Sequence, residues 1–420
     1  MAISISEEVL EKARRARDAA AKLAVMSRAS KDGILLAMAE ALEAKADHLL
    51  EANARDVQHA QARKLSAAPI DRLLLNKERI SEMADGLRAV ARLNDPVGEV
   101  IEGWRLPNGL EITKVRVPLG VIGIIYESRP NVTVDAAGLC LKSGNAAVLR
   151  GGSDAINSNL ALVEVLNESG APRGLPEGAV EIIETTDRDA AAQLMRLNEY
   201  VDVLVPRGGG DLIRRVKQES TVPVIETGEG NCHIYVDASA RLGDAEEIVV
   251  NAKCQRPGTC NAAETLLVHR EIAAAFLPRV GSRLTQLGVE LRACEAALPH
   301  LPAAKPATEA DWATEFLALV LAVKVVRDTG EAIAHIRRYG TRHSEAILTQ
   351  NLENARRFTQ EIDAAAVYVN ASTRFTDGGQ FGLGAEIGIS TQKLHARGPM
   401  GLRELTSYKY VIIGEGQVRA

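Results

Sequence analysis

The feature that most constrains the fold is a series of short, almost wholly apolar segments separated by helical patterns. Val121–Tyr126, Ala146–Leu149, Val180–Ile183, Val201–Val205 and Val222–Ile225 have this character. Apolar runs that do not alternate with polar residues are typical of strands that are buried on both faces. Helices between such strands predict a parallel sheet covered on both sides, so the sequence indicates a doubly wound α/β domain.

Further segments in the second half of the chain indicate a second α/β domain. The expected strands are His233–Val236, Thr265–Val268, Glu315–Val326, Ser344–Leu348 and Ala366–Asn370. A length of 420 residues also favours two domains over one. Two such domains predict a cleft between them, which is a common place for a ligand to bind.

The first ninety residues have the apolar spacing of helices. Ser4 and Glu7 form a capping box in front of the first helix. A second helix is expected over Ser30–Leu50 and a third over Lys77–Leu93.

A β-hairpin is expected after these helices. Residues 97–117 alternate around Asn108 and Gly109, and Asn-Gly is a strong signal for a two-residue turn. The run Tyr408–Ile413 is a late strand that we expect to pair with the hairpin. Because an exposed strand edge needs cover, these strands are expected to reach a second subunit, with a plain surface hairpin as the alternative.

The composition favours a soluble enzyme over a binder of nucleic acid or membrane. The net charge is −5 and aromatic residues make up 3%, so no basic stripe or set of stacking platforms is evident. No run approaches the ~18 apolar residues of a membrane span, and Met1–Glu11 carries acids where a signal peptide carries bases. Five cysteines without paired spacing argue against a disulfide framework and a zinc site, so we expect a cytoplasmic protein without a metal.

Cys260 is the candidate nucleophile. It lies in Asn251–Glu264, a loop rich in Asn, Lys, Arg, Gly and Pro, and such surroundings keep part of a thiol ionised. A buried structural cysteine is the alternative, because free cysteine is among the most buried residue types. Cys254 is the nearest rival, while Cys140 is expected in the core and Cys294 on a helix surface.

Two segments are candidates for holding a dinucleotide. Gly208, Gly209 and Gly210 follow an apolar strand and open a helix, so their amides are placed to hold a pyrophosphate, with a tight turn as the alternative. Arg150 and Ser153 follow another strand, at the end where open α/β sheets bind ligands. An arginine in place of an acidic ribose ligand favours a 2′-phosphate, so we expect NADPH/NADP, with a surface arginine as the alternative.

Four motifs in one order resemble those of a known family. They are Ile125–Thr133, the Cys260 loop, Tyr339–Ile347 and Val369–Gly379. Over nearly its whole length the chain resembles the glutamate-5-semialdehyde dehydrogenase (gamma-glutamyl phosphate reductase) family, a branch of the aldehyde dehydrogenase superfamily. The resemblance implies an aldehyde-dehydrogenase-like fold and NADPH-dependent reduction of L-glutamyl 5-phosphate to glutamate 5-semialdehyde plus phosphate, in proline biosynthesis.

The resemblance also implies roles for single residues. Cys260 attacks the acyl phosphate to form a thioester, and Asn131 and the Cys260 backbone N–H hold the oxyanion. Glu315 corresponds to the glutamate that holds the nicotinamide ribose. An Asx turn is the alternative for Asn131, and a surface acid is the alternative for Glu315.

Cations in the matched motifs suit a substrate that is anionic at both ends. Arg129, Arg256 and Arg374 are the candidates, and which arginine binds the phosphate and which the carboxylate stays open. His343 is a further candidate at the substrate, with a hydrogen-bonded structural histidine as the alternative.

These roles divide the chain into functional parts. Residues 1–96 and 118–227 are expected to form a dinucleotide-binding domain, and residues 228–395 a catalytic domain. Residues 97–117 and 404–420 are the expected oligomerisation elements. The implied partners are a small-molecule substrate, further copies of this chain and, as a candidate for channelling, glutamate 5-kinase.

Other classes of function stay open at this point. A cysteine-dependent hydrolase would pair Cys260 with a histidine and would need no dinucleotide. A non-catalytic scaffold would keep the fold without a reactive thiol. Among oxidoreductases, an NAD(P)-dependent dehydrogenase of another small aldehyde is the nearest alternative, and a phosphate requirement distinguishes it.

Overall fold

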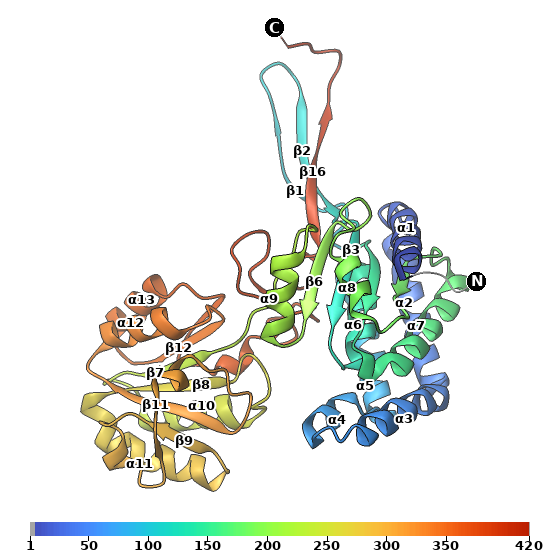
Figure 1. Cartoon of the computed structure of the whole chain (residues 1–420). Helices are drawn as coiled ribbons and strands as arrows, with labels where there is room; N and C mark the ends of the chain where they lie inside the picture. Colours follow the sequence, from blue (N-terminus) through green and yellow to red (C-terminus); the bar gives the residue numbers. More distant parts are fainter. Residues whose placement is uncertain (1–4, 420) are drawn as a thin grey trace. The chain divides into compact units, whose positions relative to one another are not determined.

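The computed structural model describes residues 5–419, and the chain divides into two compact units (Figure 1). The first unit comprises Met1–Glu226, Gly382–Gly388 and Met400–Ala420. The second unit comprises Thr227–Phe381 and Ile389–Pro399. Within residues 5–419, no helix is both long and apolar enough to cross a membrane.

The first unit is built on a parallel sheet of four strands within the described residues, in the order β5-β4-β3-β6. The strands are β3 (Val121–Tyr126), β4 (Ala146–Arg150), β5 (Val180–Ile182) and β6 (Val203–Arg207). β3 is buried along its whole length, as its continuous apolar run predicts. The strand expected at Val222–Ile225 is wrong, because only Val224 bridges to the sheet, at Leu204. Pro223 explains the difference, since it has no N–H to donate to a ladder.

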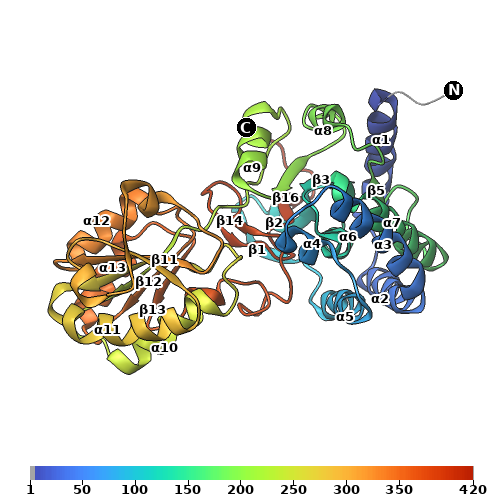
Figure 2. The same cartoon turned by 60° about the horizontal axis from the view of Figure 1, so that its bottom comes forward.

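Helices cover both faces of this sheet. On one face lie α1 (Ile5–Leu23) and α8 (Arg188–Leu194), and on the other lie α6 (Pro130–Lys142) and α7 (Ile156–Gly170). A further layer covers α6 and α7 (Figure 2); its helices are α2 (Arg28–Ala44), α3 (Ala46–Ala62) and α5 (Lys77–Arg92). The first unit therefore has the doubly wound architecture that the sequence predicts.

The helical region differs from the prediction where helices break. The single helix expected over Ser30–Leu50 is wrong, because α2 ends and α3 begins at Lys45, where the backbone leaves the helical region. The short helix α4 (Ala67–Leu73) has no counterpart among the predicted elements. Of the predicted capping box, Ser4 lies outside the described residues.

A three-stranded antiparallel ribbon extends from the first unit (Figure 1). Its strands are β1 (Val100–Arg105), β2 (Glu111–Pro118) and β16 (Thr406–Ile413). The turn between β1 and β2 has Gly109 at φ +91°, a conformation that glycine adopts readily. β16 pairs with β2 from Thr406 opposite Pro118 to Ile413 opposite Glu111, which confirms the predicted pairing of hairpin and terminal strand.

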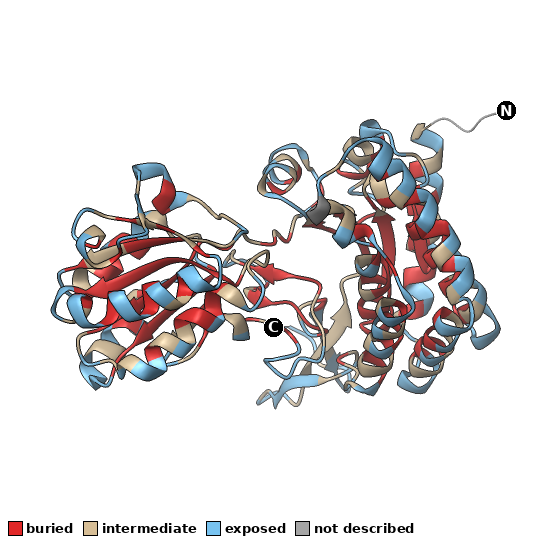
Figure 3. Ribbon diagram, turned by 90° about the horizontal axis from the view of Figure 1, so that it is seen from below, coloured by how far each residue is buried: buried red, intermediate tan, exposed pale blue. Residues whose placement is uncertain are grey.

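The second unit contains a parallel sheet of seven strands within the described residues, in the order β10-β9-β11-β8-β7-β12-β13. The strands are β7 (Cys232–Val236), β8 (Ala263–His269), β9 (Glu290–Ala293), β10 (Lys305–Pro306), β11 (Val320–Val326), β12 (Ser344–Leu348) and β13 (Ala366–Val369). Its helices are α10 (Leu242–Cys254) and α11 (Arg270–Gln286) on one face, and α12 (Thr329–Tyr339) and α13 (Leu352–Glu361) on the other. Figure 3 shows the buried strands between these exposed helical surfaces.

Two predictions in the second unit are wrong in detail. The strand expected from Glu315 begins only at Val320, because Leu317 turns the chain with φ +52°. Glu315 therefore lies in a loop and not at the head of a strand. Cys294 follows β9 instead of lying on a helix, and its Sγ accepts a hydrogen bond from the Val325 N–H at 3.4 Å.

Candidate active site

Cys260 is half-buried in the loop 255–262, which joins α10 to β8. This Cys260 loop is shorter than the expected Asn251–Glu264, because the ends of that segment belong to α10 and β8. The Cys232 thiol donates a hydrogen bond to the Cys260 carbonyl oxygen at 3.1 Å. Gly230 packs against the same carbonyl, because a Cβ built on Gly230 would stand 1.5 Å from its oxygen. The backbone of the candidate nucleophile is thus held by close contacts from Gly230 and from Cys232, the first residue of β7.

The Cys260 loop is fixed to the segment 373–376, which lies more than a hundred residues further along the chain. The Asn261 side-chain amide donates to the Thr376 carbonyl oxygen at 2.9 Å, and the Thr373 hydroxyl donates to the Asn261 carbonyl oxygen at 2.7 Å. Arg374 donates from Nη1 to the Thr259 hydroxyl at 3.0 Å. The structure therefore brings together two of the motifs that the sequence singles out.

Arg374 contacts this loop a second time, because its Nε donates to Gln255 Oε1 at 2.8 Å. Burial lowers the pKa of Arg374, and the nearby charge of Arg256 lowers it further, whereas interaction with Cys260 opposes the shift. A guanidinium stays charged in proteins, so Arg374 supplies a fixed positive charge within electrostatic range of the thiol. Such a neighbour favours the thiolate form of a cysteine. Arg256 lies on the same loop and is exposed.

The other thiols have less suitable surroundings. Burial raises the pKa of Cys140 to about 12 and raises that of Cys232 well above its ordinary value. Burial also raises the pKa of Cys254, the last residue of α10, although Lys253 and Arg283 oppose the shift. None of the five cysteines forms a disulfide in the described structure. These three thiols are therefore held in the protonated, unreactive form at neutral pH.

His343 is fully buried, next to Cys232. Its Nδ1 is 2.9 Å from the Ser344 hydroxyl oxygen and 3.7 Å from the Cys232 Sγ. Burial lowers the pKa of His343 to about 4, so the ring is neutral at neutral pH. The structural alternative for this residue fits these contacts better than a role at the substrate.

Glu315 is connected to the candidate nucleophile by two contacts, both made by Gly230. Its Oε1 accepts the Gly230 N–H at 2.6 Å, and Gly230 contacts the Cys260 carbonyl. Burial raises the pKa of Glu315. The carboxylate therefore lies in the second unit, on the loop between residue 313 and β11, next to the backbone that supports Cys260.

The first unit holds Asn131 and Arg129 at the start of α6. Arg129 is the N-cap residue of the helix, and Asn131 is exposed in its first turn. The Asn131 amide donates to Asp135 Oδ2 at 3.1 Å. Burial raises the pKa of Asp135 to about 6, while this hydrogen bond opposes the shift. Asn131 thus belongs to a different unit from Cys260.

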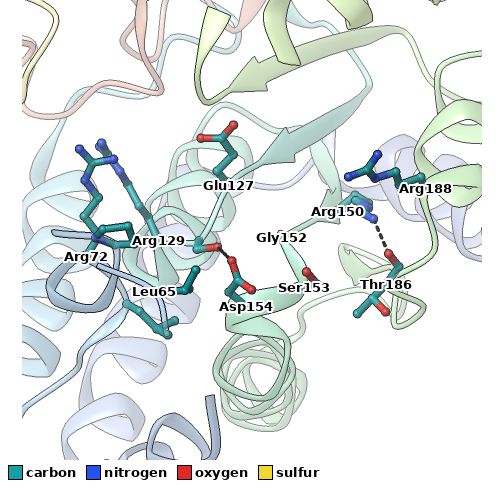
Figure 4. A pocket seen from close by; sticks show the side chains of 13 residues that line it. Leu65, Arg72, Glu127, Arg129, Arg150, Gly152, Ser153, Asp154, Thr186 and Arg188 are labelled. Atoms are coloured by element: carbon teal, nitrogen blue, oxygen red, sulfur yellow. Dashed lines mark hydrogen bonds between the residues drawn. The ribbon is translucent and has the colours of Figure 1, made fainter. Parts of the chain in front are cut away.

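A cleft of about 420 Å³ opens in the first unit at the carboxyl ends of β3 and β4. Arg72 and Arg129 project side by side on one side of it, and Arg150 and Arg188 lie on the opposite side (Figure 4). Ser128 and Ser153 also line it. Two acids, Glu127 and Asp154, line the cleft as well, so four arginines leave it with a net positive charge that suits a ligand with a phosphate group.

Arg150 lines this cleft, but most of its guanidinium is engaged by the protein. It donates to the carbonyl oxygens of Gly151 at 2.9 Å, of Thr186 at 2.9 Å and of Asp187 at 3.1 Å. Burial lowers the pKa of Arg150. Arg150 therefore braces the turn before α8, and that turn places the exposed Arg188 at the cleft. Sequence reasoning missed Arg188 and Arg72, because neither lies in a motif that marks a binding loop.

The predicted glycine loop lies at the start of α9 (Gly210–Glu219). Gly209 is the N-cap residue of this ten-residue helix, and the loop follows the carboxyl end of β6. Gly208 packs against Glu127, since a Cβ on Gly208 would lie 2.6 Å from the Glu127 Cδ. A helix N-terminus at the carboxyl end of a parallel strand is a common anion site in α/β folds. Among residues 5–419, no group of His, Cys, Asp and Glu side chains is arranged to hold a metal ion.

Comparison with known proteins gives a family for this arrangement. A model described as the aldehyde dehydrogenase family matches residues 2–297. Gamma-glutamyl phosphate reductase of Heliobacterium modesticaldum is 59% identical, over 99% of this chain and 100% of its own length. Its counterpart from Carboxydothermus hydrogenoformans is 62% identical, over 98% of this chain and 100% of its own length.

Solved structures agree with the sequence comparisons. The crystal structure of gamma-glutamyl phosphate reductase from Thermotoga maritima matches with a TM-score of 0.96 at 55% identity, over 98% of this chain and 100% of that chain. A probable aldehyde dehydrogenase from Listeria monocytogenes matches with a TM-score of 0.74 at 17% identity, over 99% and 98% of the two chains. The second match shows a shared fold alone.

Proposed function

The chain belongs to the aldehyde dehydrogenase family and, within it, to the gamma-glutamyl phosphate reductases, and we propose that it reduces L-glutamyl 5-phosphate to L-glutamate 5-semialdehyde with release of phosphate. This reaction is a step of proline biosynthesis. The observation that carries the proposal is identity of 59% and 62% to relatives of that name, over almost the whole of both chains. The environment of Cys260 supports it, because the residue is half-buried, its backbone is fixed and a guanidinium is near.

In the proposed mechanism Cys260 is the nucleophile. Its Sγ bonds to the acyl carbon, the carbon–oxygen bond to phosphate breaks, and a thioester remains on the enzyme. The oxyanion that develops is held by the Cys260 backbone N–H and the Asn131 side-chain amide. The thioester on Cys260 would be reduced by the hydride that a nicotinamide cofactor supplies when it is bound. The carbon–sulfur bond then breaks, which frees the aldehyde and returns the Cys260 thiolate.

We propose NADPH as the cofactor, and the cations of the cleft in the first unit support this choice. Arg150, Ser153 and Arg188 are the residues that would hold the 2′-phosphate. The start of α9, at Gly208–Gly210, would hold the pyrophosphate. Glu315 would hold the nicotinamide ribose, and its half-buried carboxylate already accepts one backbone N–H.

Arginines are proposed to bind the two anionic ends of the substrate. Arg256 and Arg374 lie on the two segments that meet at the Cys260 loop, which supports a role close to the reacting carbon. Arg129 is the third candidate, and it lines the cleft of the first unit beside Arg72. A bidentate guanidinium suits either a carboxylate or a phosphate.

Assembly and location are also part of the proposal. The ribbon exposes large apolar side chains, among them Tyr410 and Ile412 at 51% and 59%, so we propose that it binds a second copy of this chain.

Cysteines that form no disulfide in residues 5–419 support a reducing, cytoplasmic location. Glutamate 5-kinase is a proposed partner, because the acyl phosphate is a reactive product to hand over.

An absorbance assay in the reverse direction tests the proposed reaction. Glutamate 5-semialdehyde and NADP⁺ are supplied with and without inorganic phosphate, and formation of NADPH is followed. We expect NADPH formation only when phosphate is present, because phosphate must release the acyl group from Cys260. Equal rates without phosphate would show oxidation to the free acid and would favour a plain aldehyde dehydrogenase.

A further inference from the structure

A fully buried ion pair closes the base of the Cys260 loop. Lys253 is in the last turn of α10, before the loop, and Glu264 is the second residue of β8, after it. The Lys253 Nζ lies 2.5 Å from Glu264 Oε2, and both side chains are 0% exposed. The pair therefore joins the two ends of the loop that carries the proposed nucleophile.

The other oxygen of Glu264 holds a second loop. Glu264 Oε1 accepts the Leu317 N–H at 3.1 Å. Leu317 adopts φ +52°, a conformation that leucine rarely takes and that needs support from its surroundings. This turn sets the path of the chain between Glu315 and β11. Glu315 in turn accepts the Gly230 N–H, and Gly230 rests on the Cys260 carbonyl.

We propose that Glu264, held by Lys253, is a positioning residue that keeps the Cys260 loop and the Glu315 loop in one arrangement. One oxygen of the Glu264 carboxylate pairs with Lys253 across the base of the Cys260 loop, and the other accepts the Leu317 N–H. A carboxylate at this depth is costly to bury, and burial raises the pKa of Glu264 to about 7 although Lys253 opposes the shift. An apolar pair of similar size would fill the same space at no such cost, so the hydrogen bond to Leu317 is what the buried carboxylate adds.

The part of this inference that concerns Glu315 rests on the proposed function, in which Glu315 holds the cofactor ribose. The part that concerns Cys260 does not, because thiol reactivity is measured without cofactor or substrate. The two readouts therefore separate a failure of the proposed function from a failure of the positioning role.

Two double variants of the full-length chain differ in whether residue 264 keeps an oxygen that can accept the Leu317 N–H. Lys253→Met/Glu264→Gln removes both charges but keeps a side-chain oxygen for the Leu317 N–H. Lys253→Met/Glu264→Leu removes both charges and that oxygen. NADPH affinity is measured by fluorescence titration, reactivity of Cys260 by iodoacetamide labelling with peptide mass spectrometry, and folding by circular dichroism.

We expect the Gln variant to bind NADPH within about threefold of the unaltered protein. We expect the Leu variant to bind NADPH more than about tenfold less tightly and to label more slowly at Cys260, because the Leu317 backbone N–H loses the acceptor that fixes its turn. Lys31→Met is the matched control: it breaks a buried pair in the first unit, with Asp95 at 2.6 Å, and should leave both readouts unchanged.

Equal NADPH affinity and equal labelling in the two double variants would overturn the positioning role. If the unaltered protein fails to bind NADPH, the proposed cofactor is wrong, and the labelling rates alone decide the role of Glu264. If the Leu variant does not fold, Glu264→Asp replaces it, because aspartate keeps the charge opposite Lys253 but withdraws from Leu317 by one methylene. The same loss is expected for that variant, and unaltered affinity and labelling would again contradict the inference.

Discussion

Gly230 lies so close to Cys260 that a Cβ on residue 230 would stand 1.5 Å from the Cys260 carbonyl oxygen. The N–H of the same glycine donates to the Glu315 carboxylate at 2.6 Å. One glycine backbone thus separates the proposed nucleophile from the acid that we expect at the cofactor ribose.

Gly230→Ala is therefore expected to displace the Cys260 loop. A shift of about 1 Å at a nucleophile lowers turnover by about a hundredfold, so we expect a loss of at least that order in the phosphate-dependent assay. Gly243→Ala is the control, since no atom lies within 4 Å of a Cβ at that position in α10. Full activity of Gly230→Ala would show that the Cys260 loop accommodates a Cβ at residue 230 without displacing the thiol.

Arg188 and Arg150 are expected to differ as determinants of the cofactor. Arg188→Ala should reduce the preference for NADPH over NADH by about tenfold or more, the usual loss for a charged hydrogen bond, without lowering the melting temperature. Arg150→Ala should reduce the preference and also lower the melting temperature, because three carbonyl oxygens lose their donor. The measurements are kcat/KM with each cofactor and thermal unfolding, with the exposed Arg173→Ala as control. An unchanged cofactor ratio in Arg188→Ala would remove that residue from the proposed site.

The sequence marks Arg150 as a candidate for cofactor binding but gives no sign of Arg188. Arg150 was visible as a candidate because it follows a buried strand, and strand ends are where α/β sheets bind ligands. Its engagement by the 186–187 turn is a tertiary contact that no local pattern encodes. Arg72 and Arg188 enter the cleft on helices whose sequences indicate nothing beyond an exposed cation.

The ribbon is expected to mediate assembly. We predict that the unaltered protein is a homo-oligomer in light scattering at micromolar concentration, and that Tyr410→Glu/Ile412→Glu shifts it toward monomer. Charges on an exposed apolar strand oppose its burial against a partner. Val418→Glu is the control, because Val418 is 87% exposed but lies beyond β16. A monomeric unaltered protein, or an unchanged mass in the double variant, would contradict the prediction.

His343 is expected to make stability depend on pH. Its pKa is lowered to about 4 in the folded protein, so between pH 6.5 and 4 the unfolded chain binds a proton that the folded chain does not. The contribution of His343 to the free energy of unfolding is therefore fully present above pH 6.5 and is lost as the pH falls toward 4. Urea unfolding at pH 7.5 and pH 5 should show that His343→Gln loses about 2 kcal/mol less on acidification than the unaltered protein. Equal losses of unfolding free energy in the two proteins would mean that the pKa of His343 is the same in the folded and the unfolded chain.

The fold was largely readable from the sequence, and the errors have physical causes. Continuous apolar runs identified β3 and β4 because both faces of those strands are buried. The same logic failed at Phe316, since the apolar run continues through Leu317, where the backbone turns with φ +52°. The support for that turn comes from Glu264, which is more than fifty residues away in the sequence.

Cys260 was recognised as the candidate nucleophile for reasons that were only partly local. The cationic residues of its loop are evident in the sequence, but Arg374 approaches through the segment 373–376. The contacts of Gly230 and Cys232 with the Cys260 carbonyl depend on how β7 and β8 pair. Such contacts between distant segments have no periodicity or turn signal to mark them.

Whether Cys260 carries the acyl group is decided by the phosphate-dependent assay on two single variants. Cys260→Ala and Cys254→Ala are compared with the unaltered protein for NADPH formation from glutamate 5-semialdehyde, phosphate and NADP⁺, and NADPH binding is measured on each. We predict that Cys260→Ala has no measurable turnover and still binds NADPH, while Cys254→Ala keeps most of its activity. Turnover that survives in Cys260→Ala and disappears in Cys254→Ala would exclude Cys260 as the nucleophile and assign that role to Cys254, at the end of α10.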